Sequence, residues 1–336
     1  MTTDAGPLPH PSAATGSWRV ALEVDVAAVT GASAPQHLRG WAMGSVEPGP
    51  GPVPVLYCQA GGGCSTPYFD LQVPGRPGYS MAEAMVRTGA VVVAVDHLGL
   101  GASDAHDLFA VTPTLLAACH DLVATEVLDR LVRGTVAEGV GPVADPFLVG
   151  VGHSMGAMLT AVQQGRHGTF GALVLLGHGI GLPEVLTPDE LAVAGPDLVS
   201  VEHEIVRLAT LRFGPDSPVE SRKPARGHFF APDVPDEVRA AFGAQAVPTL
   251  PVGGLTSMIP HATDHEKAAI EVPVFLAFGD DDLVDDYLGT AAAFTACRDL
   301  ALYVLADSGH CQNQAAGRHE LWRRMTAWID AVAAGT

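Results

Sequence analysis

Apolar runs of strand length recur along the chain, and each of them ends at a turn-forming residue. Within most runs the apolar residues are continuous and do not alternate with polar ones, a pattern typical of strands covered on both faces in a parallel sheet. No helical segment separates the first two runs, 18–29 and 37–44, so the sheet is expected to begin antiparallel. The other predicted strands span residues 53–59, 91–96, 146–151, 172–176, 272–278 and 300–305.

Segments with apolar residues at helical spacing lie between these runs. The longest spans 112–138 and carries Leu116, Cys119 and Val123 on one face, the spacing of a helix that packs on a sheet. The alternation of strand and helix predicts a doubly wound α/β sheet. Three shorter helices are predicted over 79–87, 155–164 and 321–332.

The stretch between the predicted strands 172–176 and 272–278 interrupts this alternation. It is roughly 90 residues long, and a compact domain rarely holds a structureless loop of that length. Its segments have helical patterns separated by Pro and Gly, so a helical cap is expected over 181–267. The α/β core is then 18–180 together with 268–336, after a flexible start at 1–17.

The chain is strongly acidic, with a formal net charge of −19 and a pI of about 4.9. An acidic surface repels phosphate groups, so neither nucleic acid nor an anionic membrane is an expected partner. No apolar run reaches the length of about 18 residues that a spanning helix needs. The first residues also lack the basic and apolar regions of a signal peptide. No feature of the sequence predicts an oligomer.

The chain contains five cysteines, an odd number, and none of them forms a C-x-x-C pair. This pattern favours a cytoplasmic protein with reduced thiols. Cys58 and Cys64 are close enough in the sequence to bridge a loop, although two separate thiols fit the pattern better. No cluster of ligands accompanies His153 or His178, so no metal site is expected.

The clearest chemical signal is the pentapeptide Gly152-His153-Ser154-Met155-Gly156. It follows the predicted strand 146–151 and precedes a predicted helix, which is the context of a nucleophile elbow. A serine on such a turn projects its hydroxyl from the sheet edge, the glycines allow the tight backbone approach, and the helix N-terminus favours negative charge. Ser154 is therefore the candidate nucleophile. The alternative is a Gly-rich turn with a capping serine.

A serine nucleophile needs a base and an acid that orients the base. His310 follows the last predicted strand, and loops after parallel strands open at one edge of the sheet, so His310 is the candidate base. Asp280, Asp281 and Asp282 follow the seventh strand. Asp282 has the best spacing from Gly279 and is the candidate acid, whereas its two neighbours are expected to be solvated or to form the turn.

Acyl transfer at Ser154 also needs two hydrogen-bond donors for the oxyanion. The backbone N–H of Met155 is one candidate, because this residue follows the nucleophile. The glycine run after the third strand supplies the other candidate, since glycine lets the backbone approach a ligand closely. Gly62 is the first choice there, and Gly61 and Gly63 remain alternatives.

Together these residues resemble the α/β-hydrolase superfamily over nearly the whole chain. The resemblance rests on GHSMG, AGGG at 60–63, DHLGLGAS at 96–103, GDDD at 279–282 and GH at 309–310. It implies an eight-stranded, mostly parallel sheet, a cap between strands six and seven, a structural role for the 96–103 turn, and no cofactor. One departure is Ala60-Gly61, where many members carry His-Gly, and this leaves the second oxyanion donor open.

The sequence thus predicts a serine hydrolase that cleaves a carboxylic ester or lactone through an acyl-enzyme. Apolar residues in the predicted cap favour a medium-sized hydrophobic substrate. The same triad also suits acyl transfer, or hydrolysis of amides, thioesters or C–C bonds, or lyase chemistry, because a fold does not fix the reaction. A ligand-binding protein with slow or no turnover is the alternative of another class. The serine argues against dehalogenase and epoxide-hydrolase chemistry, which in this superfamily uses an aspartate nucleophile.

Overall fold

A computed structural model of the chain describes residues 16–45, 51–214, 228–284 and 286–335. Of the predicted flexible start at 1–17, residues 1–15 lie outside this description, and Ser17 already opens the first strand. The strands are β1 (Ser17–Asp25), β2 (His37–Ser45), β3 (Val53–Gln59), β4 (Val91–Val95), β5 (Pro146–His153), β6 (Ala172–Leu176), β7 (Val274–Gly279) and β8 (Leu300–Leu305).

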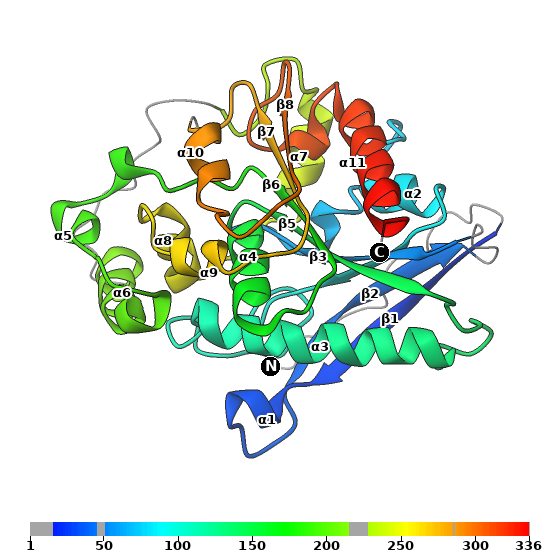
Figure 1. Cartoon of the computed structure of the whole chain (residues 1–336), viewed down its shortest axis with the longest axis horizontal. Coiled ribbons are helices and arrows are strands. Elements are labelled where there is room, and N and C mark those ends of the chain that lie inside the picture. The colour runs from blue at the N-terminus through cyan, green and yellow to red at the C-terminus, as the bar shows by residue number, and fades with distance from the viewer. Residues whose placement is uncertain (1–15, 46–50, 215–227, 285, 336) are drawn as a thin grey trace.

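All eight strands belong to one sheet, in the order β1-β2-β4-β3-β5-β6-β7-β8 (Figure 1). β2 runs antiparallel to β1 and to β4, and every other neighbouring pair is parallel. The predicted eight-stranded, mostly parallel sheet with an antiparallel beginning is confirmed. Because β3 and β5 are direct neighbours, the loops that follow these two strands emerge side by side at one edge of the sheet.

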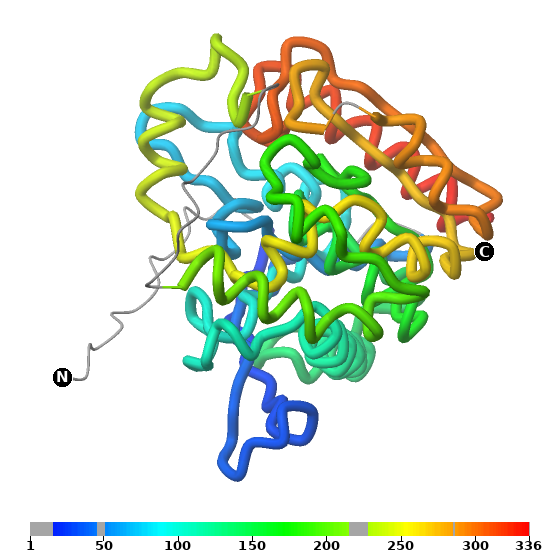
Figure 2. Tube along the Cα trace, turned by 90° about the vertical axis from the view of Figure 1, so that its left-hand side faces the viewer, coloured from blue at the N-terminus to red at the C-terminus, as the bar shows by residue number. Residues whose placement is uncertain are grey.

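The first strand is shorter than the apolar run 18–29 predicts, because β1 ends at Asp25. The next residues form a single helical turn, α1 (Ala27–Thr30), which ends at Gly31 in the left-handed region with a φ of 73°. The Asp25 carboxylate accepts the N–H of Ala27 at 2.9 Å and thereby fixes this turn. Figure 2 shows the turn protruding from the body of the molecule.

Helices cover both faces of the sheet (Figure 1). Val55 and Tyr57 of β3 face the layer that contains α3 and α4, whereas Leu56 and Cys58 face the layer that contains α2 and α11. Both side-chain sets are buried, which explains why the strand reads as a continuous apolar run. The predicted double winding is confirmed. These helices are α2 (Met81–Val86), α3 (Pro113–Arg133), α4 (Met155–His167) and α11 (Arg318–Ala333).

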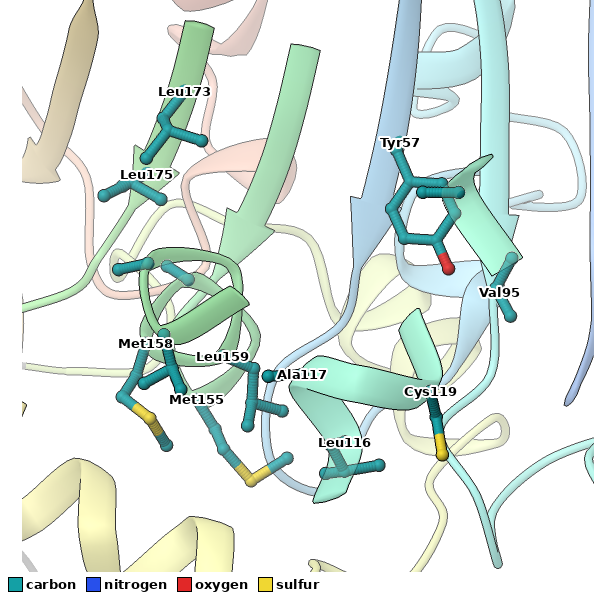
Figure 3. Close-up of a cluster of buried hydrophobic side chains, with 14 of the residues drawn as sticks. Tyr57, Val95, Leu116, Ala117, Cys119, Met155, Met158, Leu159, Leu173 and Leu175 are labelled. Carbon is teal, nitrogen blue, oxygen red and sulfur yellow. The ribbon is translucent and has the colours of Figure 1, made fainter. Parts of the chain in front are cut away.

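Between the sheet and the helices α3 and α4 lies a packed apolar core (Figure 3). In this core Leu173 and Leu175 of β6 lie above α4, and Leu159 of α4 meets Ala117 of α3. All four side chains are at least 98% buried. Dense packing of this kind fixes the start of α4, and with it the residue that precedes the helix.

Every element that the structure describes between β6 and β7 is a helix. α8 and α9 contact α4, and α6 contacts α8, whereas α7 packs beside the loop at 71–79 (Figure 2). α8 and α9 were not predicted, because Gly253 and Gly254 weaken the helical signal of the first and the second is short. The boundaries of the predicted cap at 181–267 stay a prediction. The helices are α5 (Pro188–Leu191), α6 (Leu198–Phe213), α7 (Asp236–Gly243), α8 (Pro251–Met258) and α9 (Asp264–Ala268), and α10 (Tyr287–Ala292) follows β7.

Short 3₁₀ turns complete the chain at Thr66–Tyr68, Pro183–Val185 and Gln312–Gln314. In the part of the chain that is described, no helix combines the length and the apolar character needed to cross a bilayer.

Candidate active site

Ser154 lies between the end of β5 and the start of α4, with a φ of 56° and a ψ of −123°. A residue with a side chain rarely takes a positive φ, so this backbone is strained. Glycine is required at the two neighbouring positions because there is no room for a side chain. A Cβ at Gly152 would lie 2.4 Å from Ala157 Cα, and one at Gly156 would lie 2.2 Å from the Gln59 carbonyl oxygen. The tight strand-to-helix turn therefore depends on glycine at both positions.

The structure brings His310 and Asp282 to this serine. His310 Nε2 lies 2.8 Å from Ser154 Oγ, and His310 Nδ1 lies 2.6 Å from Asp282 Oδ1. Asp282 also accepts hydrogen bonds from the N–H of Gly279 at 3.1 Å and from Gln312 Nε2 at 2.6 Å. An ionised carboxylate only accepts, so Nδ1 carries the ring proton and Nε2 presents a lone pair to the serine hydroxyl.

Asp282 is held in its ionised form. Burial by itself would raise the pKa of this carboxyl, but the charge and hydrogen bond of His310 and the N–H of Gly279 outweigh it, and the pKa lies below its ordinary value. The two neighbouring aspartates point elsewhere. Asp280 accepts the N–H of Ser308 at 2.9 Å, and Asp281 pairs with His228.

The glycine loop after β3 lies against the serine turn. A Cβ at Gly61 would lie 3.0 Å from Ser154 Cβ, and Gly63 has a φ of 76°. Of the three loop glycines, Gly62 lines the cavity that Ser154 and Met155 also line. No described loop or strand residue accepts a hydrogen bond from the backbone N–H of Gly62 or Met155. Both N–H groups are thus available to a ligand beside Ser154.

A chain of buried hydrogen bonds holds the glycine loop from its core side. His97 Nε2 donates to the Ala60 carbonyl oxygen at 2.9 Å, so its Nδ1 accepts from His120 Nε2 at 2.8 Å. His120 Nδ1 in turn accepts from the Tyr57 hydroxyl at 2.7 Å. Burial lowers the pKa of His97 to about 4 and that of His120 well below its ordinary value, so both rings are neutral. Ala60 is therefore held through its carbonyl group.

His153 packs beside the serine turn and bridges it to the loop of His310. Its ring stacks on Tyr68 with centroids 4.3 Å apart, and its Nε2 donates to the His310 carbonyl oxygen at 2.9 Å. Burial and the nearby His310 lower the pKa of His153 to about 3, so the ring stays neutral. The backbone of the candidate base is thereby tied to that of the candidate nucleophile.

All five cysteines are free thiols, so Cys58 and Cys64 do not bridge a loop. Cys311, next to His310, is buried, and burial raises its pKa well above the ordinary value. Among the described residues no group of three or more His, Cys, Asp or Glu side chains could hold a metal ion.

The serine hydroxyl opens into a cavity of about 190 Å³. Among the wall residues to which the sequence assigned no site role are His178 and Phe229. His178 lies two residues after the end of β6, and the sequence already places it near a strand end at the active edge of the sheet, although with no role in the site. Phe229 comes from the segment before α7, and its ring edge faces His310 at 5.6 Å between centroids; no local pattern indicates this. The wall residues are Gly62, Ser154, Met155, Gly177, His178, Gly179, Gly181, Leu182, Phe229, Thr249, Gly254, Ser257, Met258, Leu283, Val284 and His310.

Residues 60–321 match the family model described as the alpha/beta hydrolase family. A search of curated proteins found no match. The matched stretch begins at the glycine loop and includes Ser154, Asp282 and His310.

Several solved structures share the fold. An esterase from Thermogutta terrifontis is 16% identical with a TM-score of 0.60, and the match covers 94% of this chain and 99% of that one. A bromoperoxidase from Bacillus anthracis is 17% identical with a TM-score of 0.56, covering 92% and 99%. A lipase in an open form is 18% identical with a TM-score of 0.58, covering 94% and 99%. Their different names show that the fold likeness does not select the reaction.

Proposed function

The chain belongs to the alpha/beta hydrolase family, and from this premise we propose that it is a serine hydrolase that cleaves a carboxylic ester or lactone through an acyl-enzyme. The observation that carries the proposal is the continuous hydrogen-bond chain from Ser154 Oγ through His310 to Asp282. Each member has the geometry that its role requires: a strained nucleophile turn, a lone pair directed at the hydroxyl, and an ionised acid behind the ring.

In the first step Ser154 Oγ attacks the ester carbonyl carbon while His310 Nε2 takes the hydroxyl proton. The tetrahedral oxyanion binds to the N–H groups of Met155 and Gly62, at the positive end of the dipole of α4. Asp282 stabilises the imidazolium that forms. His310 then gives the proton to the leaving alcohol oxygen as the C–O bond breaks, and the acyl-enzyme remains.

In the second step water attacks the acyl carbon and His310 takes the water proton. The second tetrahedral intermediate collapses, His310 returns the proton to Ser154 Oγ, and the acid is released. Asp282 keeps its negative charge throughout, since its lowered pKa leaves it ionised at neutral pH.

The cavity supports a neutral substrate. Its described wall residues are apolar, uncharged polar or histidine, and an uncharged wall suits the acyl and alcohol parts of an ester or lactone. A volume of about 190 Å³ fits a small or medium-sized substrate. The five free thiols support the further expectation of a reducing compartment such as the cytoplasm.

Hydrolysis of p-nitrophenyl esters with short and medium acyl chains tests this proposal. The wild type should cleave at least one of them, and Ser154→Ala should lower kcat/KM by about 10⁴-fold or more. Ser200→Ala is the matched control, because Ser200 is an exposed serine on α6 whose hydroxyl bonds the Asp197 carbonyl group. This control should stay within about threefold of wild type, as exposed substitutions usually do.

Labelling with a fluorophosphonate separates the two parts of the proposal. Covalent labelling of the wild type that is absent in Ser154→Ala, without hydrolysis of any ester, would keep the nucleophile but reject the ester substrate. Full esterase activity in Ser154→Ala would reject Ser154 as the nucleophile.

A further inference from the structure

The segment after β6 passes directly beside the candidate base. A Cβ at Gly177 would lie 3.1 Å from His310 Cε1, and one at Gly179 would lie 2.2 Å from Val284 Cγ1. Glycine at both positions lets the backbone run between the His310 ring and the side chain of Val284. The residue between them, His178, therefore stands in the wall of the cavity that Ser154 and His310 share.

His178 is 4% exposed, and its ring has no hydrogen-bond partner among the described residues. Its Nε2 is fully buried. Among the other buried histidines, His97, His120 and His310 each engage both ring nitrogens. His153 also leaves one ring nitrogen, Nδ1, without a partner, but it is not a wall residue of the cavity. A buried polar atom without a partner costs about 1–3 kcal/mol. Of the described wall residues of the cavity, only His178 carries such an atom, so a substrate in the cavity is the available source of a partner for its ring.

The ring of His178 is neutral. Burial, and then the positive charge of Lys267, lower its pKa well below the ordinary value. Lys267 is itself buried and pairs with Asp264 at 3.1 Å. A neutral imidazole offers one N–H donor and one acceptor. Because the described wall residues are uncharged, the group that matches His178 is a neutral oxygen function.

We propose that His178 hydrogen-bonds an oxygen of the substrate other than the scissile ester group, so that the natural substrate is a neutral ester or lactone with a second oxygen function, such as a ketone or hydroxyl. This inference rests on the proposed function and narrows its substrate class. Gly62 and Met155 remain the donors to the scissile carbonyl oxygen. His178 is a specificity residue, and the chemical step does not pass through it.

Pairs of esters of equal shape test the inference. On the acyl side, p-nitrophenyl 4-oxopentanoate is compared with p-nitrophenyl 4-methylpentanoate, and on the alcohol side acetonyl acetate with isobutyl acetate. For each pair, the wild-type kcat/KM of the ketone ester is divided by that of the plain ester, and the same ratio is taken for the rate constants of hydrolysis by hydroxide. In at least one pair the enzymatic ratio should exceed the hydroxide ratio by about fivefold or more. A hydrogen bond to a neutral group provides a preference of this size. This measurement needs no variant.

His178→Leu should reduce the ketone preference of that pair by about fivefold or more. His178→Gln keeps a donor and an acceptor and should restore part of the preference. His203→Leu is the matched control, since His203 is exposed on α6, and its ketone preference should equal that of wild type. The thermal midpoint of His178→Leu should be unchanged or raised, because a buried unpaired nitrogen is removed.

The outcomes separate this inference from the proposed function. Labelling of Ser154 without cleavage of any ester would count against the ester function itself. If the enzyme cleaved both members of each pair with a kcat/KM ratio equal to the ratio of their hydroxide rate constants, the role of His178 would be overturned and the ester function would stand. The same holds if His178→Leu folds, cleaves both esters and keeps the wild-type ketone preference, or if it slows the plain ester as much as the ketone.

Discussion

The backbone of Ser154 is strained, and the residues around it maintain the strain. A φ of 56° at a non-glycine residue costs free energy of order 1–3 kcal/mol. Ser154 N–H donates to the Leu176 carbonyl oxygen at 2.8 Å, and the glycines on either side admit the neighbouring backbone. The hydroxyl is thereby fixed toward His310 before any substrate arrives, which lowers the cost of reaching the transition state.

The three adjacent aspartates allow a direct test of which of them is the acid of the site. Asp282→Asn should lower kcat by about 10³–10⁴-fold with a small change in KM, because the amide no longer fixes the His310 tautomer or stabilises its cation. Asp281→Asn is the control, since the side chain of Asp281 is 45% exposed and pairs with His228 instead. Steady-state kinetics on one ester check this, and equal losses in both variants would contradict the assignment of Asp282.

At the scale of elements, the position of the glycine loop after β3 depends on buried groups in the core. The chain from Tyr57 through His120 and His97 ends at the Ala60 carbonyl oxygen, one residue before Gly61. Its members belong to β3, α3 and the turn after β4. The same turn holds itself together, because Asp96 accepts the N–H of Ala102 at 2.9 Å. The position of the loop is thus set by three elements of the core.

His97→Leu should therefore lower kcat about tenfold, because the Ala60 carbonyl group loses its donor and the N–H of Gly62 shifts from its place. Tyr57→Phe is the matched control. It removes the far end of the same chain, so it should cost about 1–3 kcal/mol in the free energy of unfolding and leave kcat unchanged. Denaturant unfolding and ester kinetics on both variants check this. Equal kcat in the two variants would remove His97 from the positioning of the loop.

At the scale of the whole molecule, buried neutral histidines couple stability to pH. The pKa of His97 is lowered to about 4 and that of His153 to about 3, and burial lowers those of His120 and His178 as well. An unfolded histidine has a pKa of about 6.5. Below that pH the unfolded chain binds protons that the folded chain excludes, so stability is complete above about pH 6.5 and falls as the pH is lowered.

Each such histidine should cost up to about 2 kcal/mol in the free energy of unfolding on going from pH 7 to pH 5. His178→Leu removes one of them without breaking a hydrogen bond to a described residue. The difference in unfolding free energy between pH 7 and pH 5 should therefore be about 2 kcal/mol smaller in this variant than in wild type. Urea unfolding at both pH values measures it, and an equal loss in both proteins would show that His178 is protonated in the folded state.

Much of the fold was predictable because its signals are local. Continuous apolar runs and helical spacing gave the sheet and its main helices, and GHSMG between a strand and a helix gave the position of the elbow. The extra turn α1 and the Gly-rich helix α8 were missed. A carboxylate cap at Asp25 ends β1 inside an apolar run, and packing against α4 overrides the weak propensity of α8.

The sequence by itself determined which strand each functional group follows. Ser154 follows β5, acidic residues follow β7 and His310 follows β8. Each group could be placed because a recognisable strand precedes it. Only the tertiary structure decided that Asp282 meets His310, that Gly62 lines the cavity, and that His178 and Phe229 complete its wall. The two bonded pairs of the site are 28 and 156 residues apart in the chain. Contacts over such distances arise when parallel strands bring their loops to one edge of the sheet, and no local pattern of residues encodes them.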